Sequence, residues 1–274
     1  MRLDRGKVTA RRLKIQISYD GTAYHGWQVQ PGQETVQGVL QRVLTELEGA
    51  PVLVAGSGRT DAGVHALGQV GAFTLENRIP APNLQQYMNR LLPPDIRILS
   101  VEETYADFDP RRHATAKTYE YRIITSPVCS PLERLYVHHH PFPLDEASMM
   151  RAAPLLEGEH DFSAFAASDV RDALGYSKVR TIFSSALARQ CERLIYRVRG
   201  SGFLKHMVRN MVGTLLEVGK GNIDEPKLRA MLEPGYPGKA GLRAPASGLF
   251  LVSVEYGTRG SAEATPPTPE TEDA

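Results

Sequence analysis

The chain has 274 residues, 42% of them hydrophobic and 23% charged, so it is long enough for two modest domains or one large one around a real core. Its two cysteines form no Cys-x-x-Cys pair, which argues against a disulfide framework and a thiolate metal site. No apolar run approaches the length of a membrane span, and the N-terminus lacks the apolar stretch of a signal peptide. We therefore expect a cytoplasmic protein with no membrane partner.

The net charge of +1 conceals two ends of opposite sign. Residues 1–14 hold six lysines and arginines and one acid, and we predict a basic N-terminal arm over residues 1–13. Residues 258–274 hold four acids and one arginine among many prolines and threonines, which predicts a disordered acidic tail. The body between them is near neutral, so it binds nucleic acid only if its positive charge gathers on one face.

The first half is predicted to run strand, helix, two strands, helix and strand. Its clearest element is a helix that Thr35 caps, that carries one apolar stripe, and that ends at Gly49. We expect Asn83 to cap the second helix and Pro93-Pro94 to stop it. The expected strands cover residues 14–20, 52–55, 69–75 and 96–101.

The second half repeats this plan with additions. Its expected strands cover residues 119–124, 135–139, 179–187, 194–198 and 248–256. Short helices are expected to begin near Asp145 and Asp224, and a long helix to run from Phe203 to Val218. The repeated β-α-β-β-α-β order predicts an α+β fold of two ferredoxin-like halves, with mainly antiparallel sheets joined edge to edge and a cleft between them.

We place the domain boundaries where the two patterns meet. An N-terminal ferredoxin-like domain is expected over residues 14–105, and a C-terminal one over residues 106–257. The loops around residues 21–30 and 56–68 of the first domain are expected to open into the cleft.

The segment Gly58-Arg59-Thr60-Asp61-Ala62-Gly63-Val64-His65-Ala66 is the strongest sign of chemistry in the chain. It follows a predicted buried strand, and its glycines permit a sharp turn and the close approach of a ligand. Arg59 is suited to bind phosphate or to reach into a stack of bases, and Asp61 offers a nucleophile or a base. The alternative for such a segment is a surface turn with a salt bridge.

Arg209 lies in a predicted helix that is apolar almost all round, and such a helix is buried. A buried guanidinium keeps its proton and needs an anion. Either Arg209 forms a structural ion pair or reaches water at the helix edge, or it pairs with Asp61 or a substrate phosphate. Pairing with Asp61 would hold that carboxylate ionised and aimed.

Three further patterns have competing interpretations. Tyr119 and Tyr121 face the same way on one strand, as core residues or, at the cleft end, as a platform for an unpaired base. The strand 193–199 gathers three arginines on one face, either a surface for a phosphate backbone or ordinary solvated charge. The run 138–140 holds three histidines without a completing carboxylate, so we expect no metal site.

The chain resembles the TruA family of tRNA pseudouridine synthases from about residue 14 to residue 256. The matching segments are Tyr19-Asp20-Gly21-Thr22 with Gly26-Trp27-Gln28, Gly58 to Ala66, Lys117-Thr118-Tyr119-Glu120-Tyr121, Phe203-Leu204 with His206-Met207-Val208-Arg209-Asn210 and Val212-Gly213, and Arg243-Ala244-Pro245 with Gly248-Leu249. The basic arm, the connection 159–177 and the acidic tail lie outside the family pattern.

The resemblance implies that Asp61 is the catalytic nucleophile, with Arg209 as its ion-pair partner. It implies that Tyr119 contacts the base and that Arg59 takes the place of the flipped base. It also implies a homodimer that isomerises uridines at positions 38, 39 and 40 in the anticodon arm of tRNA, with no cofactor and no metal. From the residues alone, Asp61 either attacks the sugar or the base, or removes a sugar proton.

Two other functions remain open from the residues alone. A non-catalytic RNA-binding module would use aromatic side chains on a ferredoxin-like sheet, but it gives no reason for Asp61 beside a buried arginine. A hydrolase of nucleosides or other glycosidic bonds would also use Asp61, but it usually has a second carboxylate or a metal set.

Overall fold

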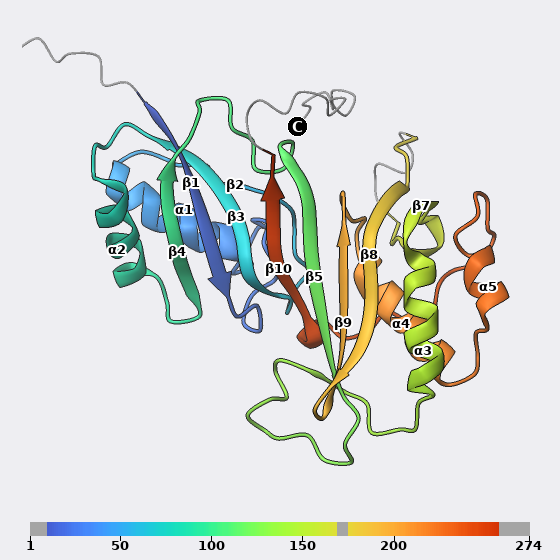
Figure 1. Ribbon diagram of the computed structural model, residues 1–274. Helices are drawn as coiled ribbons and strands as arrows, with labels where there is room; N and C mark the ends of the chain where they lie inside the picture. Colours follow the sequence, from blue (N-terminus) through green and yellow to red (C-terminus); the bar gives the residue numbers. More distant parts are fainter. Residues whose placement is uncertain (1–9, 169–174, 258–274) are drawn as a thin grey trace, which may run out of the picture.

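Strands from both halves of the chain join into one sheet (Figure 1). The computed structural model describes residues 10–168 and 175–257. Among these residues the sheet has ten strands, in the order β4-β1-β3-β10-β5-β9-β8-β7 with β2 beside β3 and β6 beside β5. The β3–β10 and β5–β6 pairs are parallel and the other pairs are antiparallel. The mixed α and β class with a mainly antiparallel sheet is confirmed. The predicted acidic tail and most of the predicted basic arm lie outside the described residues.

The first half contains the elements β1 (Arg11–Tyr19), α1 (Val36–Glu48), β2 (Ala55–Gly56), β3 (His65–Leu75), α2 (Ala81–Leu91) and β4 (Ile96–Glu103). The predicted caps of α1 are confirmed: the Thr35 hydroxyl accepts from the Gly38 N–H, and Gly49 has a left-handed φ of 73°. β1 begins at Arg11, inside the predicted arm, because Arg11 pairs with Leu75 of β3.

Two predictions for the first half are wrong in detail. α2 begins at Ala81 after Pro80, with Pro82 in its first turn, so Asn83 lies inside the helix and does not cap it. Proline is favoured at that position because its fixed φ suits the first turn and its missing N–H is not needed there. The predicted strand 52–55 forms a ladder only from Ala55, where β2 meets β3.

The second half contains the elements β5 (Ala114–Ile124), β6 (His138–His139), α3 (Glu146–Ala152), η1 (Ala153–Leu156), β7 (Gly158–Asp161), η2 (Ser163–Phe165), β8 (Val179–Gln190), β9 (Arg193–Gly200), α4 (Met207–Gly219), α5 (Glu225–Ala230), η4 (Ala246–Gly248) and β10 (Leu249–Tyr256). The predicted helix starts near Asp145 and Asp224 are confirmed, and both side chains cap their helices by accepting from a backbone N–H of the first turn. α4 begins at Met207 and not at Phe203, because His206 has a left-handed φ of 64° that no α-helix contains. β7 was not predicted.

The two halves meet where β3 lies parallel to β10, with His65 opposite Phe250 and Ala66 opposite Leu251. One cluster of buried apolar side chains runs through both halves, from β1 to α4. Figure 1 shows α1 and α4 behind the strands, on one face of the sheet. The loop that precedes β3 therefore reaches the junction from one half, while α4 approaches it from the other.

Candidate active site

Asp61 lies in the loop between β2 and β3, and hydrogen bonds from two other segments fix Thr60, the residue before it. The Trp27 N–H donates to the Thr60 carbonyl over 3.1 Å, and the hydroxyls of Tyr19 and Thr60 are 2.8 Å apart. Gly26 has a φ of 89°, and a Cβ there would lie 2.5 Å from the Thr60 carbonyl oxygen. The segment around Trp27 thus supports the Asp61 loop, and only glycine permits this approach.

The chain turns sharply immediately after Asp61. The Val64 N–H donates to the Asp61 carbonyl over 3.1 Å, and Gly63 has a φ of 76°, a conformation that glycine adopts at no steric cost. The turn directs the chain into β3 and leaves the Asp61 side chain 28% exposed at the surface of the loop.

Arg209 of α4 lies against this carboxylate. Its Nη1 donates to Oδ2 of Asp61 over 2.9 Å, and its Nε donates to the Ala244 carbonyl over 2.7 Å. The Arg209 side chain is only 11% exposed. A guanidinium held on two sides has little freedom, so it sets both the position and the orientation of the carboxylate.

His206 and Arg243 complete the surroundings of Asp61. Nε2 of His206 lies 3.6 Å from Oδ2 of Asp61, and Nη1 of Arg243 lies 2.7 Å from Nδ1 of His206. Burial lowers the pKa of His206, while the charge of Asp61 opposes that shift. Sequence reasoning assigned no role to either residue. The signal was the position of His206, three residues before Arg209.

Tyr119 of β5 is buried beside the loop. Its ring packs edge to face against Phe203 with centroids 5.0 Å apart. Burial, with smaller contributions from Tyr19 and Asp61, raises the pKa of its phenol. The structure therefore brings Tyr119, Asp61 and Arg209 together, while Arg59 is exposed on the same loop.

Lys117, two residues before Tyr119 on β5, supports the start of the loop. Its ammonium donates to the Ser57 carbonyl over 2.6 Å, and a Cβ at Gly58 would lie 3.1 Å from Nζ. Burial, with a smaller contribution from Arg111, lowers the pKa of Lys117 to about 8. Side chains alternate along a strand, so Lys117 and Tyr119 lie on the same face of β5. This spacing is the feature of the sequence that could have indicated the contact.

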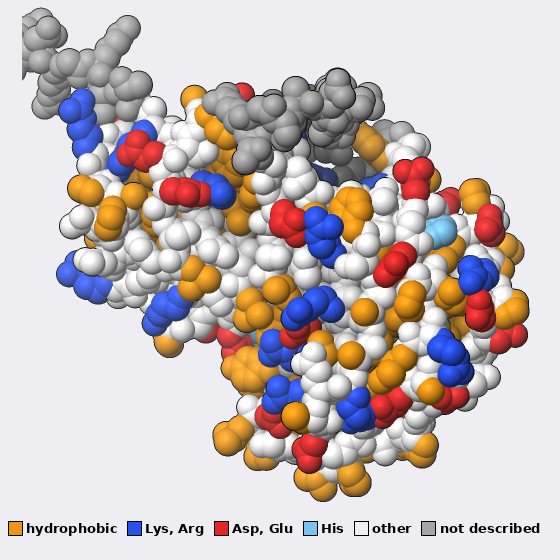
Figure 2. Space-filling model, in the orientation of Figure 1, with side chains coloured by type: hydrophobic (Ala, Val, Ile, Leu, Met, Phe, Trp, Pro, Cys, Tyr) orange, Lys and Arg blue, Asp and Glu red, His pale blue; other side chains and the backbone are white. Residues whose placement is uncertain are grey.

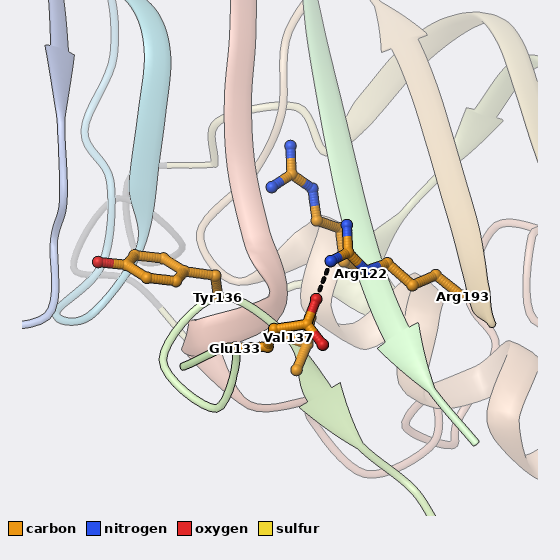
Figure 3. Close-up of a pocket in the computed structure, with 5 residues that line it drawn as sticks. All are labelled: Arg122, Glu133, Tyr136, Val137 and Arg193. Atoms are coloured by element: carbon orange, nitrogen blue, oxygen red, sulfur yellow. Dashed lines mark hydrogen bonds and ion pairs between the residues drawn. The ribbon is translucent and has the colours of Figure 1, made fainter. Parts of the chain in front are cut away.

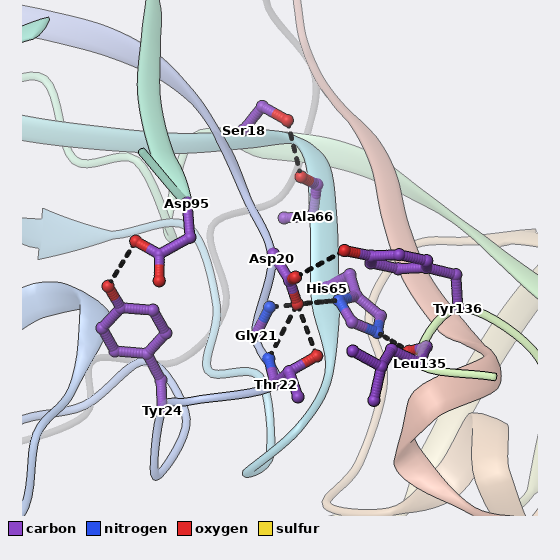
Figure 4. Close-up of polar contacts among 10 residues, drawn as sticks. All are labelled: Ser18, Asp20, Gly21, Thr22, Tyr24, His65, Ala66, Asp95, Leu135 and Tyr136. Carbon is purple, nitrogen blue, oxygen red and sulfur yellow. Dashed lines mark hydrogen bonds and ion pairs between the residues drawn. The ribbon is translucent and has the colours of Figure 1, made fainter. Parts of the chain in front are cut away.

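His65 links the two halves at the strand junction. Its ring stacks on Phe250 with centroids 4.8 Å apart. Nδ1 lies 3.1 Å from the Gly21 nitrogen, and Nε2 lies 2.9 Å from the Leu135 carbonyl oxygen (Figure 4). Burial lowers the pKa of this imidazole. Nδ1 also lies 3.1 Å from Oδ1 of Asp20, whose charge opposes the effect of burial on this pKa.

The arginines of β9 lie on the face of the sheet away from Tyr119, and each has a carboxylate partner. The pairs are Arg193–Glu133, Arg197–Glu120 and Arg199–Glu255. Figure 3 shows the first pair in a small pocket beside Arg122 and Tyr136. Figure 2 shows positive and negative side chains intermingled on the face of the molecule seen there. The predicted concentration of positive charge on this strand is therefore balanced by acid.

The histidine run 138–140 forms no cluster with other ligands. Among residues 10–168 and 175–257, no three His, Cys, Asp or Glu side chains gather where they could hold a metal ion. In the same residues, no helix combines the length and the apolar composition needed to cross a membrane.

Comparison with known proteins gives a consistent result. The sequence model of a family described as tRNA pseudouridine synthase matches residues 15–111 and 152–257. The chain is 63% identical over 246 residues to tRNA pseudouridine synthase A of Solibacter usitatus (strain Ellin6076), which covers 90% of this chain and 100% of that protein.

Two further relatives of the same name are each 44% identical over 246 residues. They come from Pelobacter propionicus, with 90% of this chain and 100% of the relative covered, and from Lacticaseibacillus casei, with 89% and 98% covered. The segments that the family model matches span most of the chain and contain Asp61, His206 and Arg209. This chain therefore belongs to the tRNA pseudouridine synthase family.

Proposed function

We propose that this chain is an isomerase that converts uridine to pseudouridine in tRNA, at positions 38, 39 and 40 of the anticodon arm. The observation that carries the proposal is the Asp61 carboxylate, held 2.9 Å from a nearly buried arginine beside a buried tyrosine. Its relatives, named tRNA pseudouridine synthase A, support the same reaction and substrate.

The reaction breaks the bond from N1 of uracil to C1′ of ribose and forms a bond from C5 to C1′. N1 gains a proton and C5 loses one, so the conversion balances without an oxidant, a reductant or a second substrate. A uridine within a stacked helix is out of reach, so the target base must flip into the site at a cost of a few kcal/mol. Closure around the base then keeps the detached ring from diffusing away.

Within this proposal Asp61 is the nucleophile, attacking either the sugar or the base. Arg209 is its ion-pair partner and holds the carboxylate in one orientation, since its guanidinium is bound on two sides. Tyr119 contacts the base. Arg59, exposed on the same loop, enters the stack in place of the flipped base.

The proposal extends to the architecture and the assembly. The first half has the strand order β4-β1-β3-β2 and the second the order β10-β5-β9-β8, which supports two ferredoxin-like domains over residues 14–105 and 106–257. On the family resemblance, we also propose a homodimer that acts on cytoplasmic tRNA.

A glycosidic-bond hydrolase is the main competing function, because it would use the same carboxylate. Hydrolases of this type usually need a second carboxylate to protonate the leaving group, and the side chains found beside Asp61 in the described part of the chain are an arginine, an imidazole and a phenol. A binding module without catalysis would not require a carboxylate held by Arg209.

The deciding experiment uses an unmodified tRNA transcript that carries tritium at C5 of uridine. The proposal expects tritium release into water at the rate at which pseudouridine forms, at no more than a few uridines per tRNA. Free uracil would indicate the hydrolase, and binding without either product would indicate the binding module. Pseudouridine mapped outside the anticodon arm would overturn the proposed positions while leaving the reaction intact.

A further inference from the structure

His206 has a backbone conformation that side chains disfavour. Its φ of 64° lies in the left-handed region, and one other non-glycine residue in the described chain, Cys191, shares that feature. A residue with a Cβ is strained there, and such strain persists where the surroundings or the function require it. At this position, immediately before α4, glycine would relieve the strain, yet the residue is histidine.

The contacts of the imidazole define which nitrogen carries its proton. Nη1 of Arg243 lies 2.7 Å from Nδ1 of His206 and 3.3 Å from Nε2. A guanidinium only donates hydrogen bonds, so the closer nitrogen, Nδ1, must accept. The neutral ring then carries its proton on Nε2, which lies 3.6 Å from Oδ2 of Asp61.

Two donors therefore converge on the same oxygen of Asp61. Nη1 of Arg209 approaches Oδ2 to 2.9 Å, and Nε2 of His206 faces that oxygen from the start of the same helix. Both contacts fall on Oδ2, so the carboxylate is approached by Arg209 and His206 through one of its two oxygens.

We propose that His206 is a positioning residue of the isomerase: Arg243 holds it as the Nε2–H form, and it fixes Oδ2 of Asp61 so that Oδ1 faces the target nucleotide. This inference rests on the proposed function. It accounts for the strained backbone, because the left-handed conformation is what carries the imidazole back from α4 toward the Asp61 loop. In this proposal, the 3.6 Å between Nε2 of His206 and Oδ2 of Asp61 shortens to a hydrogen bond when the site closes on the substrate.

Burial lowers the pKa of His206, and the charges that face the ring come from four directions. Asp61 faces it from the loop before β3, Arg243 from the segment before η4, Arg209 from α4, and Lys205 is its neighbour in the chain. Burial and the three cations lower the pKa of His206, and Asp61 alone among these groups raises it. A second proton would turn Nδ1 into a donor facing Arg243, so protonation at acidic pH would displace the ring.

The first test is His206→Gly, measured in single-turnover reactions at saturating tRNA. Glycine relieves the strained φ, so the thermal unfolding midpoint should equal or exceed that of the unaltered protein. The rate of pseudouridine formation should nevertheless fall about tenfold or more, with tRNA affinity changed by less than about threefold. Full activity in this variant would overturn the inference. Loss of both activity and stability would also overturn it, because it would assign His206 to the fold.

The second test uses the pH profile of the same single-turnover rate. His206→Gln retains an N–H donor near the Nε2 position and does not titrate, so it should recover most of the rate lost in His206→Gly and lose the acidic decline. Arg243→Met removes a cation beside the ring, so the acidic decline should move to higher pH. An acidic decline unchanged in both variants would refute the role of His206.

The matched control is His160→Gln, the same substitution in β7 at the far edge of the sheet, and it should leave the rate and profile unaltered. The results distinguish a wrong proposed function from a wrong role for His206. If the unaltered protein forms no pseudouridine, the proposed function is wrong. If it does, and Asp61→Asn is inactive while His206→Gly is fully active, only the inference about His206 is wrong.

Discussion

Arg209 donates to Asp61 over 2.9 Å although 148 positions separate them in the chain. Asp61 follows a two-residue strand of the first half, and Arg209 lies in the first turns of a helix of the second half. This ion pair forms because β3 and β10 lie side by side where the two halves meet. Their pairing brings the loop before β3, which carries Asp61, next to α4. The candidate site therefore exists only when both halves are folded and joined.

Asp61→Asn should abolish isomerisation, because the amide is neither a nucleophile nor a base. The fold and the tRNA affinity should persist, since the substitution keeps the size of the side chain. Tritium release from C5-labelled tRNA measures the reaction, and filter binding measures affinity. Asp145→Asn is the matched control, because asparagine caps α3 as well as aspartate does. Substantial activity in Asp61→Asn would remove this residue from its central role.

Arg209→Met should lower both activity and stability. It leaves the Ala244 carbonyl and the Asp61 carboxylate without their donor, which typically costs about 1–3 kcal/mol in the free energy of unfolding. Arg209→Lys keeps the charge but loses the planar fork, so it should restore stability in part and activity poorly. Urea unfolding and single-turnover rates measure the two effects. A fully active Arg209→Met protein would show that Asp61 works without this partner.

Arg59→Gln should weaken tRNA binding. If Arg59 contacts the RNA backbone as well as the stack, the slope of log affinity against log salt should fall by about one. Arg197→Gln is the matched control: it removes the same charge, but from the face of β9 that lies away from Tyr119. We expect it to change the slope less than Arg59→Gln does. Equal effects of both variants would mean that the β9 arginines leave their carboxylates for phosphate.

Lys117 should make stability depend on pH. Its pKa in the folded protein is about 8, below the ordinary value of 10.5, so the unfolded chain binds more protons between these values. The free energy of unfolding should therefore rise with pH through this window, whereas at neutral pH the buried charge costs stability. Between pH 8 and pH 9.5, the unaltered protein should gain about 1–2 kcal/mol relative to Lys117→Met.

Urea unfolding at several pH values measures this difference. Lys239→Met, at an exposed lysine, is the control for the loss of a positive charge. Curves for Lys117→Met and the unaltered protein that stay parallel from pH 8 to pH 9.5 would contradict the buried position of the ammonium.

Local chemistry made several features predictable from the sequence by itself. Thr35 caps α1 and Gly49 ends it, and helices begin after Asp145 and Asp224, because a helix end depends on one side chain and the nearest backbone N–H groups. The same holds for the apolar stripe of α1. The family was also evident in the sequence, since the segment from Gly58 to Ala66 places an arginine and a carboxylate between glycines.

Only the tertiary structure decided which distant groups meet. From the sequence, the anion beside Arg209 was either Asp61, another acid or a substrate phosphate. In the structure it is Asp61, because the parallel pairing of β3 with β10 brings the Asp61 loop next to α4. The β9 arginines look like a basic surface in sequence, but carboxylates on other strands and loops balance them.

The start of α4 also depends on both the local sequence and a contact with a distant residue. Helical periodicity extends back to Phe203, yet His206 interrupts the helix with a left-handed residue to reach Asp61 and Arg243. Hydrophobic spacing reports which face of a segment is buried, and capping residues report where it ends. Neither pattern indicates which charged side chain from another part of the chain lies against that face. That contact depends on how strands distant in the sequence pair with one another in the folded core.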